Sequence, residues 1–131
     1  MTSRVAPRMR HRIYETEYLG GSVTNQNTGT ISGFNAIYGY RAITVVNAGT
    51  IAGNATYFTL ALGNANVVGA GVDLNLGGSV TNQSTGVISG FNGIFGGSFG
   101  HTGVADATVV NAGSIAGNAT YGAGVRLRGG R

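Results

Sequence analysis

The chain has 131 residues, a length that suits one domain, and it contains 25 glycines and a single proline. Charged residues make up 9% and apolar residues 42%, which excludes a disordered chain, and the glycines lack the every-third spacing of collagen. The absence of cysteine excludes disulfides and cysteine-based metal sites, and no run of 18 apolar residues predicts a membrane-spanning segment.

The net charge of +4 is concentrated at the two ends of the chain. Residues 19–124 carry only Arg41, Asp73 and Asp106 as charged side chains. A nucleic-acid-binding protein would instead present a basic stripe along its body. The charge distribution therefore predicts no nucleic-acid partner.

Residues 1–18 differ in composition from the rest of the chain. They hold six of the twelve charged residues and the only proline, and their basic residues are not followed by the apolar stretch of a secretory signal. We predict a basic N-terminal leader or cap here, with a short helix near residues 8–18.

From residue 19 onward the chain repeats itself. LGGSVTNQNTGTISG at 19–33 returns as LGGSVTNQSTGVISG at 76–90, and TVVNAGTIAGNATY at 44–57 returns as TVVNAGSIAGNATY at 108–121. Internal repeats of this kind indicate a solenoid.

Within the repeats, apolar and polar residues alternate as in strands with one buried face. Val72 and Leu74, for example, alternate with Asp73 and Asn75. We therefore predict that residues 19–131 form an all-β domain, a right-handed single-stranded parallel β-helix of about four coils. The expected coils are 22–43, 44–78, 79–107 and 108–130.

The two longer coils carry insertions that a solenoid tolerates as loops. Residues 58–70 and 96–107 are the expected insertions. Because they leave the stacked coils untouched, we expect both to protrude and to be more mobile than the core.

Four kinds of residue recur at matching places in the repeated phrases. Two inward apolar ladders are expected, one of Val23, Val45, Val80 and Val109, the other of Ile31, Ile51, Ile88 and Ile115. A hydrogen-bonded amide ladder is expected from Asn25, Asn47, Asn82 and Asn111. Turn glycines with positive φ are expected at Gly33, Gly53, Gly90 and Gly117.

Residues 96–100 match the G-x-S-x-G pattern of serine hydrolases, with His101 and Asp106 nearby. That motif needs a strand–turn–helix and the order Ser, acid, His, whereas no helix is predicted here and His101 precedes Asp106. We therefore expect a glycine-rich loop, and replacing Ser98, His101 or Asp106 by alanine should remove no activity.

The sequence predicts no metal site and no cofactor. Gly69–Asp73 is similar to a calcium-binding nonapeptide, but Asn75 stands where that motif needs an apolar residue, and the sister copy has Arg126 in place of Asp73. His11 and His101 lack spaced partner ligands. No catalytic, cofactor-binding or metal-binding residue is predicted.

Two surface patterns leave binding functions open. Aromatic residues recur in pairs, either to bind sugars or to fill the core, namely Phe34/Phe91, Tyr38/Phe95 and Tyr57/Tyr121. Thr28-Gly29-Thr30 hints at the threonine arrays of ice-binding solenoids, but the matching Thr85-Gly86-Val87 breaks the array, and no regular threonine lattice is evident.

The phrases VTNQNTGTISG, VVNAGTIAG, VTNQSTGVISG and VVNAGSIAG, followed by AGVDL or AGVRL, resemble repeats in the passenger domains of bacterial autotransporters. The resemblance covers about residues 19–128 and implies a right-handed parallel β-helix at the Gram-negative cell surface or secreted, commonly in adhesion or aggregation. The chain lacks the export signal and the membrane barrel of that family, so we expect a passenger fragment.

We therefore expect a non-catalytic structural or adhesive segment with a host-surface or carbohydrate ligand. One alternative is a carbohydrate-acting or carbohydrate-binding β-helix protein, and catalysis on a carbohydrate would need clustered acidic residues. Another is an ice- or surface-binding module. End-to-end association is also expected, because the terminal coils of a solenoid expose strand edges.

Overall fold

The computed structural model describes residues 2–5, 10–11, 13–15, 20–54, 57–59, 66–97, 106–118 and 120–127. All the regular secondary structure among these residues consists of β-strands. Fifteen of the strands form three five-stranded sheets in which all neighbours are parallel, and the other two form a separate hairpin.

The three sheets run side by side along the molecule. The first contains, in order, β1 (Thr2–Val5), β4 (Gly21–Asn25), β7 (Ile43–Asn47), β12 (Gly78–Asn82) and β15 (Ala107–Asn111). The second contains β2 (Arg10–His11), β5 (Thr30–Gly33), β8 (Thr50–Gly53), β13 (Val87–Ser89) and β16 (Ser114–Ala116). The third contains β3 (Ile13–Glu15), β6 (Ile37–Gly39), β11 (Val72–Leu74), β14 (Ile94–Gly96) and β17 (Val125–Leu127).

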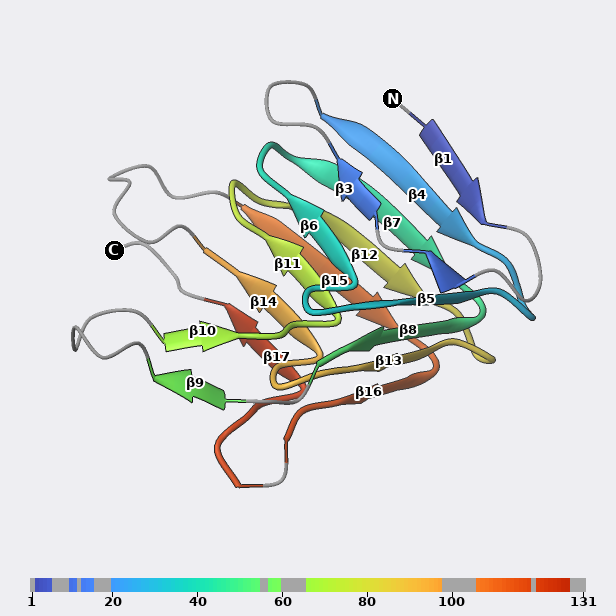
Figure 1. Cartoon of the computed structure of the whole chain (residues 1–131). Helices are drawn as coiled ribbons and strands as arrows, with labels where there is room; N and C mark the ends of the chain where they lie inside the picture. The colour runs from blue at the N-terminus through green and yellow to red at the C-terminus, as the bar shows by residue number, and fades with distance from the viewer. Residues whose placement is uncertain are drawn as a thin grey trace.

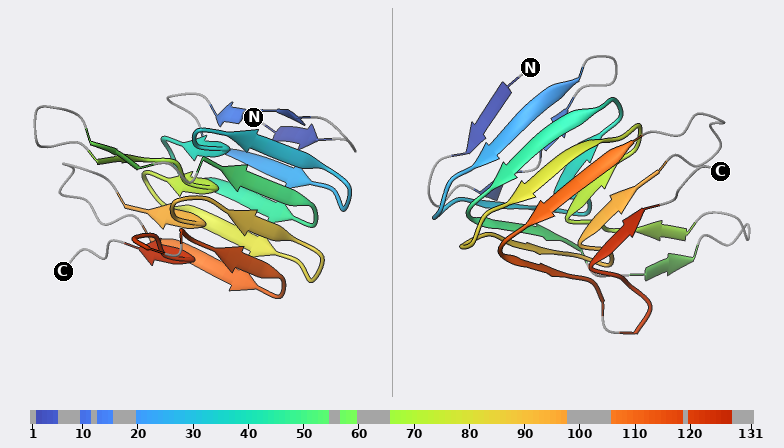
Figure 2. Two further views of the ribbon diagram at one scale, coloured as in Figure 1. Left: turned by 60° about the horizontal axis from the view of Figure 1, so that its bottom comes forward. Right: turned by 180° about the vertical axis from the view of Figure 1, so that it is seen from behind.

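One strand from each sheet makes up one coil, because all three sheets stack their strands in the order of the chain (Figures 1 and 2). This arrangement is a parallel β-helix, which confirms the predicted fold class. The four predicted coils correspond to the sets that begin with β4, β7, β12 and β15.

Residues 2–15 contribute a further strand to each sheet. The predicted helix near residues 8–18 is wrong at Arg10–His11 and Ile13–Glu15, which pair in parallel with β5 and β6. A lone helix of about ten residues is marginal in water, whereas the open edges of the neighbouring strands offer partners for the backbone groups.

Two kinds of coil alternate along the axis. Residues 21–39 and 78–96 share the GSVTNQ…ISGFN sequence, and we call them A-type coils. Residues 43–74 and 107–127 share the TVVNAG…IAGNATY sequence, and we call them B-type coils. The structural repeat is therefore a pair of coils.

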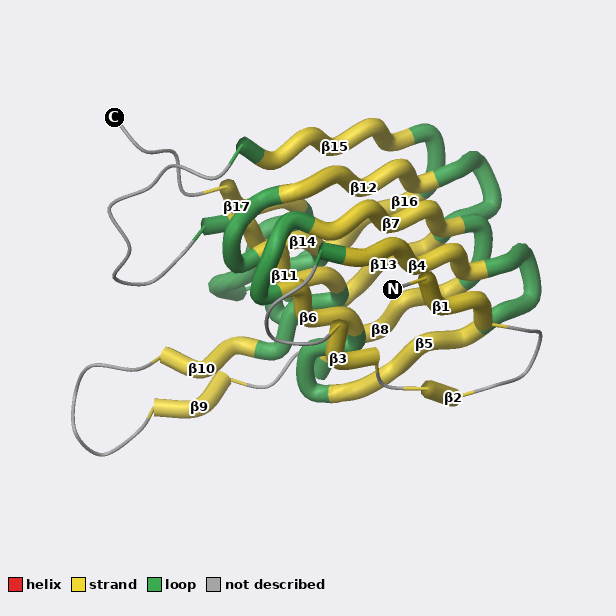
Figure 3. Tube along the Cα trace, turned by 90° about the horizontal axis from the view of Figure 1, so that it is seen from above, coloured by secondary structure: helices red, strands yellow, loops and turns green. Residues whose placement is uncertain are grey.

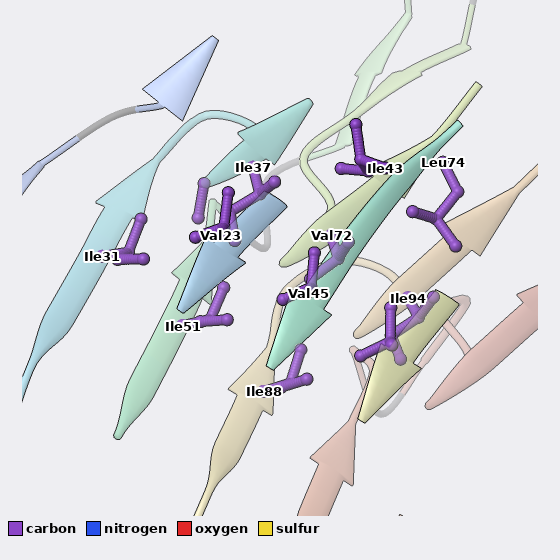
Figure 4. Close-up of a cluster of buried hydrophobic side chains, with 12 residues drawn as sticks. Val23, Ile31, Ile37, Ile43, Val45, Ile51, Val72, Leu74, Ile88 and Ile94 are labelled. Atoms are coloured by element: carbon purple, nitrogen blue, oxygen red, sulfur yellow. The ribbon is translucent and has the colours of Figure 1, made fainter. Parts of the chain in front are cut away.

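The predicted inward ladders are confirmed (Figure 4). Val23, Val45 and Val80 lie in register and are fully buried, and Ile31, Ile51 and Ile88 behave in the same way. In the last coil Val109 and Ile115 keep the register but are only partly buried. The third sheet adds an inward row that the sequence did not predict, formed by Ile37, Val72 and Ile94.

Large and small residues alternate at one corner of the core. Along the third sheet Gly39, Leu74, Gly96 and Leu127 lie in register. A Cβ atom on Gly39 would lie 2.6 Å from Ile43 Cδ1, and one on Gly96 would lie 2.7 Å from Leu127 Cδ2. The glycines of A-type coils therefore leave room for the bulky side chains of B-type coils.

The asparagine ladder is also confirmed. Asn25 Nδ2 donates to Asn47 Oδ1 at 2.8 Å, Asn47 Nδ2 donates to Asn82 Oδ1 at 2.8 Å, and Asn82 Nδ2 donates to Asn111 Oδ1 at 2.9 Å. The same amides donate to turn carbonyls, such as Asn47 Nδ2 to Gly49 O at 3.0 Å. Burying an amide without hydrogen bonds would cost free energy. Here the buried amides bond to one another and to backbone carbonyls of the turn between the first two sheets.

The predicted positive φ at the four glycines is wrong. Among the described glycines, positive φ occurs at Gly77, Gly78 and Gly97. The expected glycines instead permit close backbone contact, since a Cβ on Gly90 would lie 2.6 Å from Gly71 N and one on Gly53 would meet the Ala70 carbonyl.

The first insertion forms an antiparallel hairpin of β9 (Tyr57–Thr59) and β10 (Asn66–Val68). This hairpin projects away from the coils (Figure 3), as predicted for 58–70, whereas Gly69 and Ala70 are buried parts of the coil. Of the second insertion, residues 98–105 lie outside the described residues, while Gly96 and Ala107 belong to strands.

Candidate functional site

The outward face of the third sheet carries Asp73, a partly buried carboxyl that stands out chemically among the described residues. In β11 the buried Val72 and Leu74 point inward, so Asp73 between them points outward. Its register partners are Tyr38 in β6 and Phe95 in β14, and Phe95 is followed by Arg126 in β17. We call Tyr38, Asp73, Phe95 and Arg126 the outer row.

Asp73 is held in a polar cluster beside the turn that precedes β6. Asn35 Nδ2 donates to Asp73 Oδ2 at 3.3 Å, and Asn35 Oδ1 accepts the Ala70 backbone N–H at 2.8 Å. Asn75 Nδ2 donates to the Tyr38 hydroxyl at 3.3 Å. The repeated Gly-Phe-Asn and Ala-Gly-Val-Asp/Arg-Leu phrases could have indicated this cluster, but sequence reasoning did not identify it.

Burial raises the pKa of Asp73 from its ordinary value of 3.8 to about 7. Burial, then the neighbouring Asp73 carboxylate, then Tyr40 raise the pKa of Tyr38. The folded protein therefore favours the protonated carboxyl, so between about pH 4 and pH 7 it binds more protons than the unfolded chain.

We expect the free energy of unfolding to fall as the pH rises from about 4 to about 7, and the Asp73 contribution to level off above that. The expected loss is on the order of 1–3 kcal/mol, below the full shift of about 4 kcal/mol, because Asp73 keeps some contact with solvent. Denaturant unfolding of the wild type and of Asp73→Asn at about pH 4.5 and pH 8 measures it. Asp106→Asn, at an exposed site, is the control, and equal pH dependence in wild type and Asp73→Asn would contradict the expectation.

Asn92 occupies the same position as Asn35, two coils farther along. Its Oδ1 accepts the Ala123 backbone N–H at 3.1 Å, as Asn35 Oδ1 does from Ala70. Its Nδ2 is buried and has no hydrogen-bond partner. Arg126 stands at the position where Asp73 accepts the matching bond, so this coil lacks the acceptor.

Replacing Arg126 by asparagine should supply that acceptor and raise the free energy of unfolding by about 1 kcal/mol. Arg126→Gln is the matched control, since its amide extends one methylene farther from the backbone than the Asp73 carboxyl does. Thermal unfolding of both variants tests the idea, and a decrease in stability for Arg126→Asn would contradict it.

The hydrolase-like residues do not assemble into a described site. Ser98 and His101 lie outside the described residues, and Asp106 is exposed, with its backbone carbonyl accepting Gly78 N–H at 3.0 Å. In the described part of the chain, no three His, Cys, Asp or Glu residues gather where they could hold a metal ion.

The recurring aromatic residues divide into buried and exposed ones. Phe91 and Phe95 are 3% and 4% exposed, so their rings cannot offer a face to a sugar. Tyr121 is 76% exposed. For Phe91 and Phe95 the structure favours the packing role over the sugar-binding role.

The outward face of the first sheet carries one regular row of hydroxyl groups, which the sequence reasoning did not find. Ser22, Thr44, Ser79 and Thr108 lie in register on successive strands, and Ser79 Oγ donates to Thr44 Oγ1 at 3.4 Å. The second row, two residues along each strand, contains Thr24, Val46, Thr81 and Val110.

Comparisons with protein families, with curated proteins and with solved structures find no match to this chain. No helix among the described residues is long and apolar enough to cross a membrane.

Proposed function

We propose that this chain is a non-catalytic structural or adhesive segment of a bacterial cell-surface or secreted autotransporter-like protein. The main support is the uninterrupted register of the Asn25–Asn111 ladder and of the apolar ladders through four coils. The valine, asparagine and isoleucine residues that recur in each coil serve to stack the coils on one another. The resemblance of the repeats to passenger repeats supports the cellular setting.

A host-surface or carbohydrate ligand would contact the segments that project from the stacked coils. The β9–β10 hairpin projects from the stack, and the exposed Tyr121 lies in the turn before β17. Loops held on a rigid scaffold are common binding elements, and tyrosine offers an aromatic face to a sugar.

Display of the chain on non-adherent bacteria tests the proposal. We expect the cells to attach to a glycan-coated or matrix-coated surface or to one another, and we expect Tyr121→Ala or deletion of residues 60–65 to weaken attachment without unfolding the chain. Thr120→Ala, beside the tyrosine, is the matched control. A displayed, folded chain that leaves the cells as dispersed as an empty anchor would overturn the adhesive role.

The outward rows of the first sheet, one of hydroxyl groups and one that alternates threonine with valine, favour a second candidate, an ice- or surface-binding module. Side chains on successive strands are spaced by about 4.8 Å and every second residue along a strand by about 6.7 Å, so the rows form a regular grid. Thr44→Glu and Thr81→Glu should then abolish ice shaping or thermal hysteresis. Wild-type protein without either effect would eliminate this candidate.

The carbohydrate-acting alternative rests on one residue. A carboxyl with a pKa of about 7 suits a general acid, but glycoside hydrolysis needs a second carboxyl facing the same bond. Asp106 precedes a strand of the first sheet, whereas Asp73 lies in the third. Polysaccharide cleavage that disappears in Asp73→Asn would favour this alternative over adhesion.

A further inference from the structure

No described residue covers the outer side of the last coil, residues 107–127, at the end of the stack (Figure 2). Val125 and Leu127 are 41% and 45% exposed, whereas Val72 and Leu74 at the same positions of the preceding B-type coil are fully buried. Val109 and Ile115 are likewise only partly buried. The apolar side chains that fill the core in the other coils are therefore partly exposed at this end of the stack.

The polar groups of this face are also arranged to continue the stack. Asn47 Nδ2 donates both to the Gly49 carbonyl in its own coil and to Asn82 Oδ1 in the next coil. Asn111 Nδ2 donates to the Gly113 carbonyl, and among the described residues it has no axial acceptor. An asparagine Oδ1 in a following coil would complete the ladder.

The molecule already contains the interface that this face would form. The B-type coil 43–74 is covered by the A-type coil 78–96 through β7–β12, β8–β13 and β11–β14. In that interface Leu74 lies in register with Gly96, and Ile43 lies in register with Gly78, whose Cβ would meet the Ile43 carbonyl. Leu127 would lie in register with the matching glycine of a following A-type coil.

We propose that the exposed end of the last coil is a docking surface for an A-type coil carried by another polypeptide segment. The partner would add one parallel strand to each sheet, with Val, Asn, Ile and Gly at the positions of Val80, Asn82, Ile88 and Gly96. Strand addition satisfies the edge backbone groups, and the side-chain pattern gives the specificity. The inference is independent of any adhesive role, because it rests on the interface alone.

A second copy of the chain is a poorer fit to this face. The first coil of a second copy has Val5 in register with the asparagine ladder. It has Glu15 at the position that holds glycine in A-type coils. Stacked head to tail, it would leave the Asn111 amide without an acceptor and set a charged residue against Leu127.

The test inserts a copy of residues 75–97 into the chain directly after Leu127, so that three residues link the two coils as in 75–77. The N–H groups of Ala112 and Ser114 already donate to the preceding coil, so those of Val109 and Asn111, which alternate with them, face the open edge. We expect backbone amide exchange at Val109 and Asn111 to slow by at least about tenfold, and the thermal midpoint to rise. The matched control carries the same insertion with leucine at the glycine that faces Leu127, and a second carries alanine at the asparagine that faces Asn111. Both should lose most of the protection.

Two results would overturn the proposal. Equal protection by the matched and the mismatched insertions would show that the face does not select an A-type coil, and an insertion that stays unprotected would show that it does not bind one. Protection in the unmodified chain that rises with its concentration to the same level would assign the face to a second copy.

Discussion

Replacement of Asn47 by alanine is expected to lower the free energy of unfolding by about 3–5 kcal/mol. Asn47 lies at the centre of the amide ladder, where its Oδ1 accepts from Asn25 and its Nδ2 donates to Asn82. Alanine would leave the buried Asn82 Oδ1 without its donor and would remove the bonds of the Asn47 amide to the Gly49 and Val87 carbonyls. Each uncompensated group costs about 1–3 kcal/mol, a large part of the stability of a small domain.

Asn111→Ala is the matched control for this prediction. Asn111 has the same sequence context, but it is exposed at the end of the ladder, so solvent can replace the lost bonds. Its loss should cost about 1 kcal/mol or less. Denaturant unfolding of both variants is the measurement, and equal losses would mean that the ladder contributes no more at its buried centre than at its end.

Ile51→Ala is expected to destabilise the chain by about 2–5 kcal/mol. Ile51 is fully buried between Ile31 and Ile88 in the second sheet, so its truncation leaves a cavity that has coils on both sides. Thin cores of this kind cannot collapse easily, because the neighbouring coils are fixed by their backbone ladders.

Ile115→Ala serves as the comparison, since Ile115 has the same neighbour, Ile88, on one side only. Its truncation should cost about half as much, because part of its surface is already in contact with solvent. Thermal unfolding of the two variants decides the matter. A loss at Ile115 as large as that at Ile51 would show that the last coil is covered in solution.

The ladders of the first two sheets could be predicted because their spacing is the same in every coil of one type. Isoleucine follows asparagine by six positions in the A-type coils and by four in the B-type coils, so the repeated phrases align without ambiguity. The third sheet follows segments of varying length, and its strands have only three residues each. Its inward row and its glycine–leucine alternation therefore emerge only in three dimensions.

The candidate site was hidden for a related reason. Asn35 and Asp73 are 38 residues apart, and nothing local in the sequence marks them as partners. The raised pKa of Asp73 comes from burial by neighbouring coils, which a lone acidic residue in a strand does not reveal. Residues 2–15 were misread because they share no phrase with the repeats, although they pair with them.

The amide ladder gives the stack a direction. Every bond runs the same way, from the amide nitrogen of one coil to the carbonyl oxygen of the next, so the bond dipoles add along the axis. At one end of the ladder Asn25 Oδ1 is buried and accepts no bond from the described residues, and at the other end Asn111 offers a donor. A coil presented in reverse would place nitrogen opposite nitrogen, so the two ends of the ladder are chemically distinct.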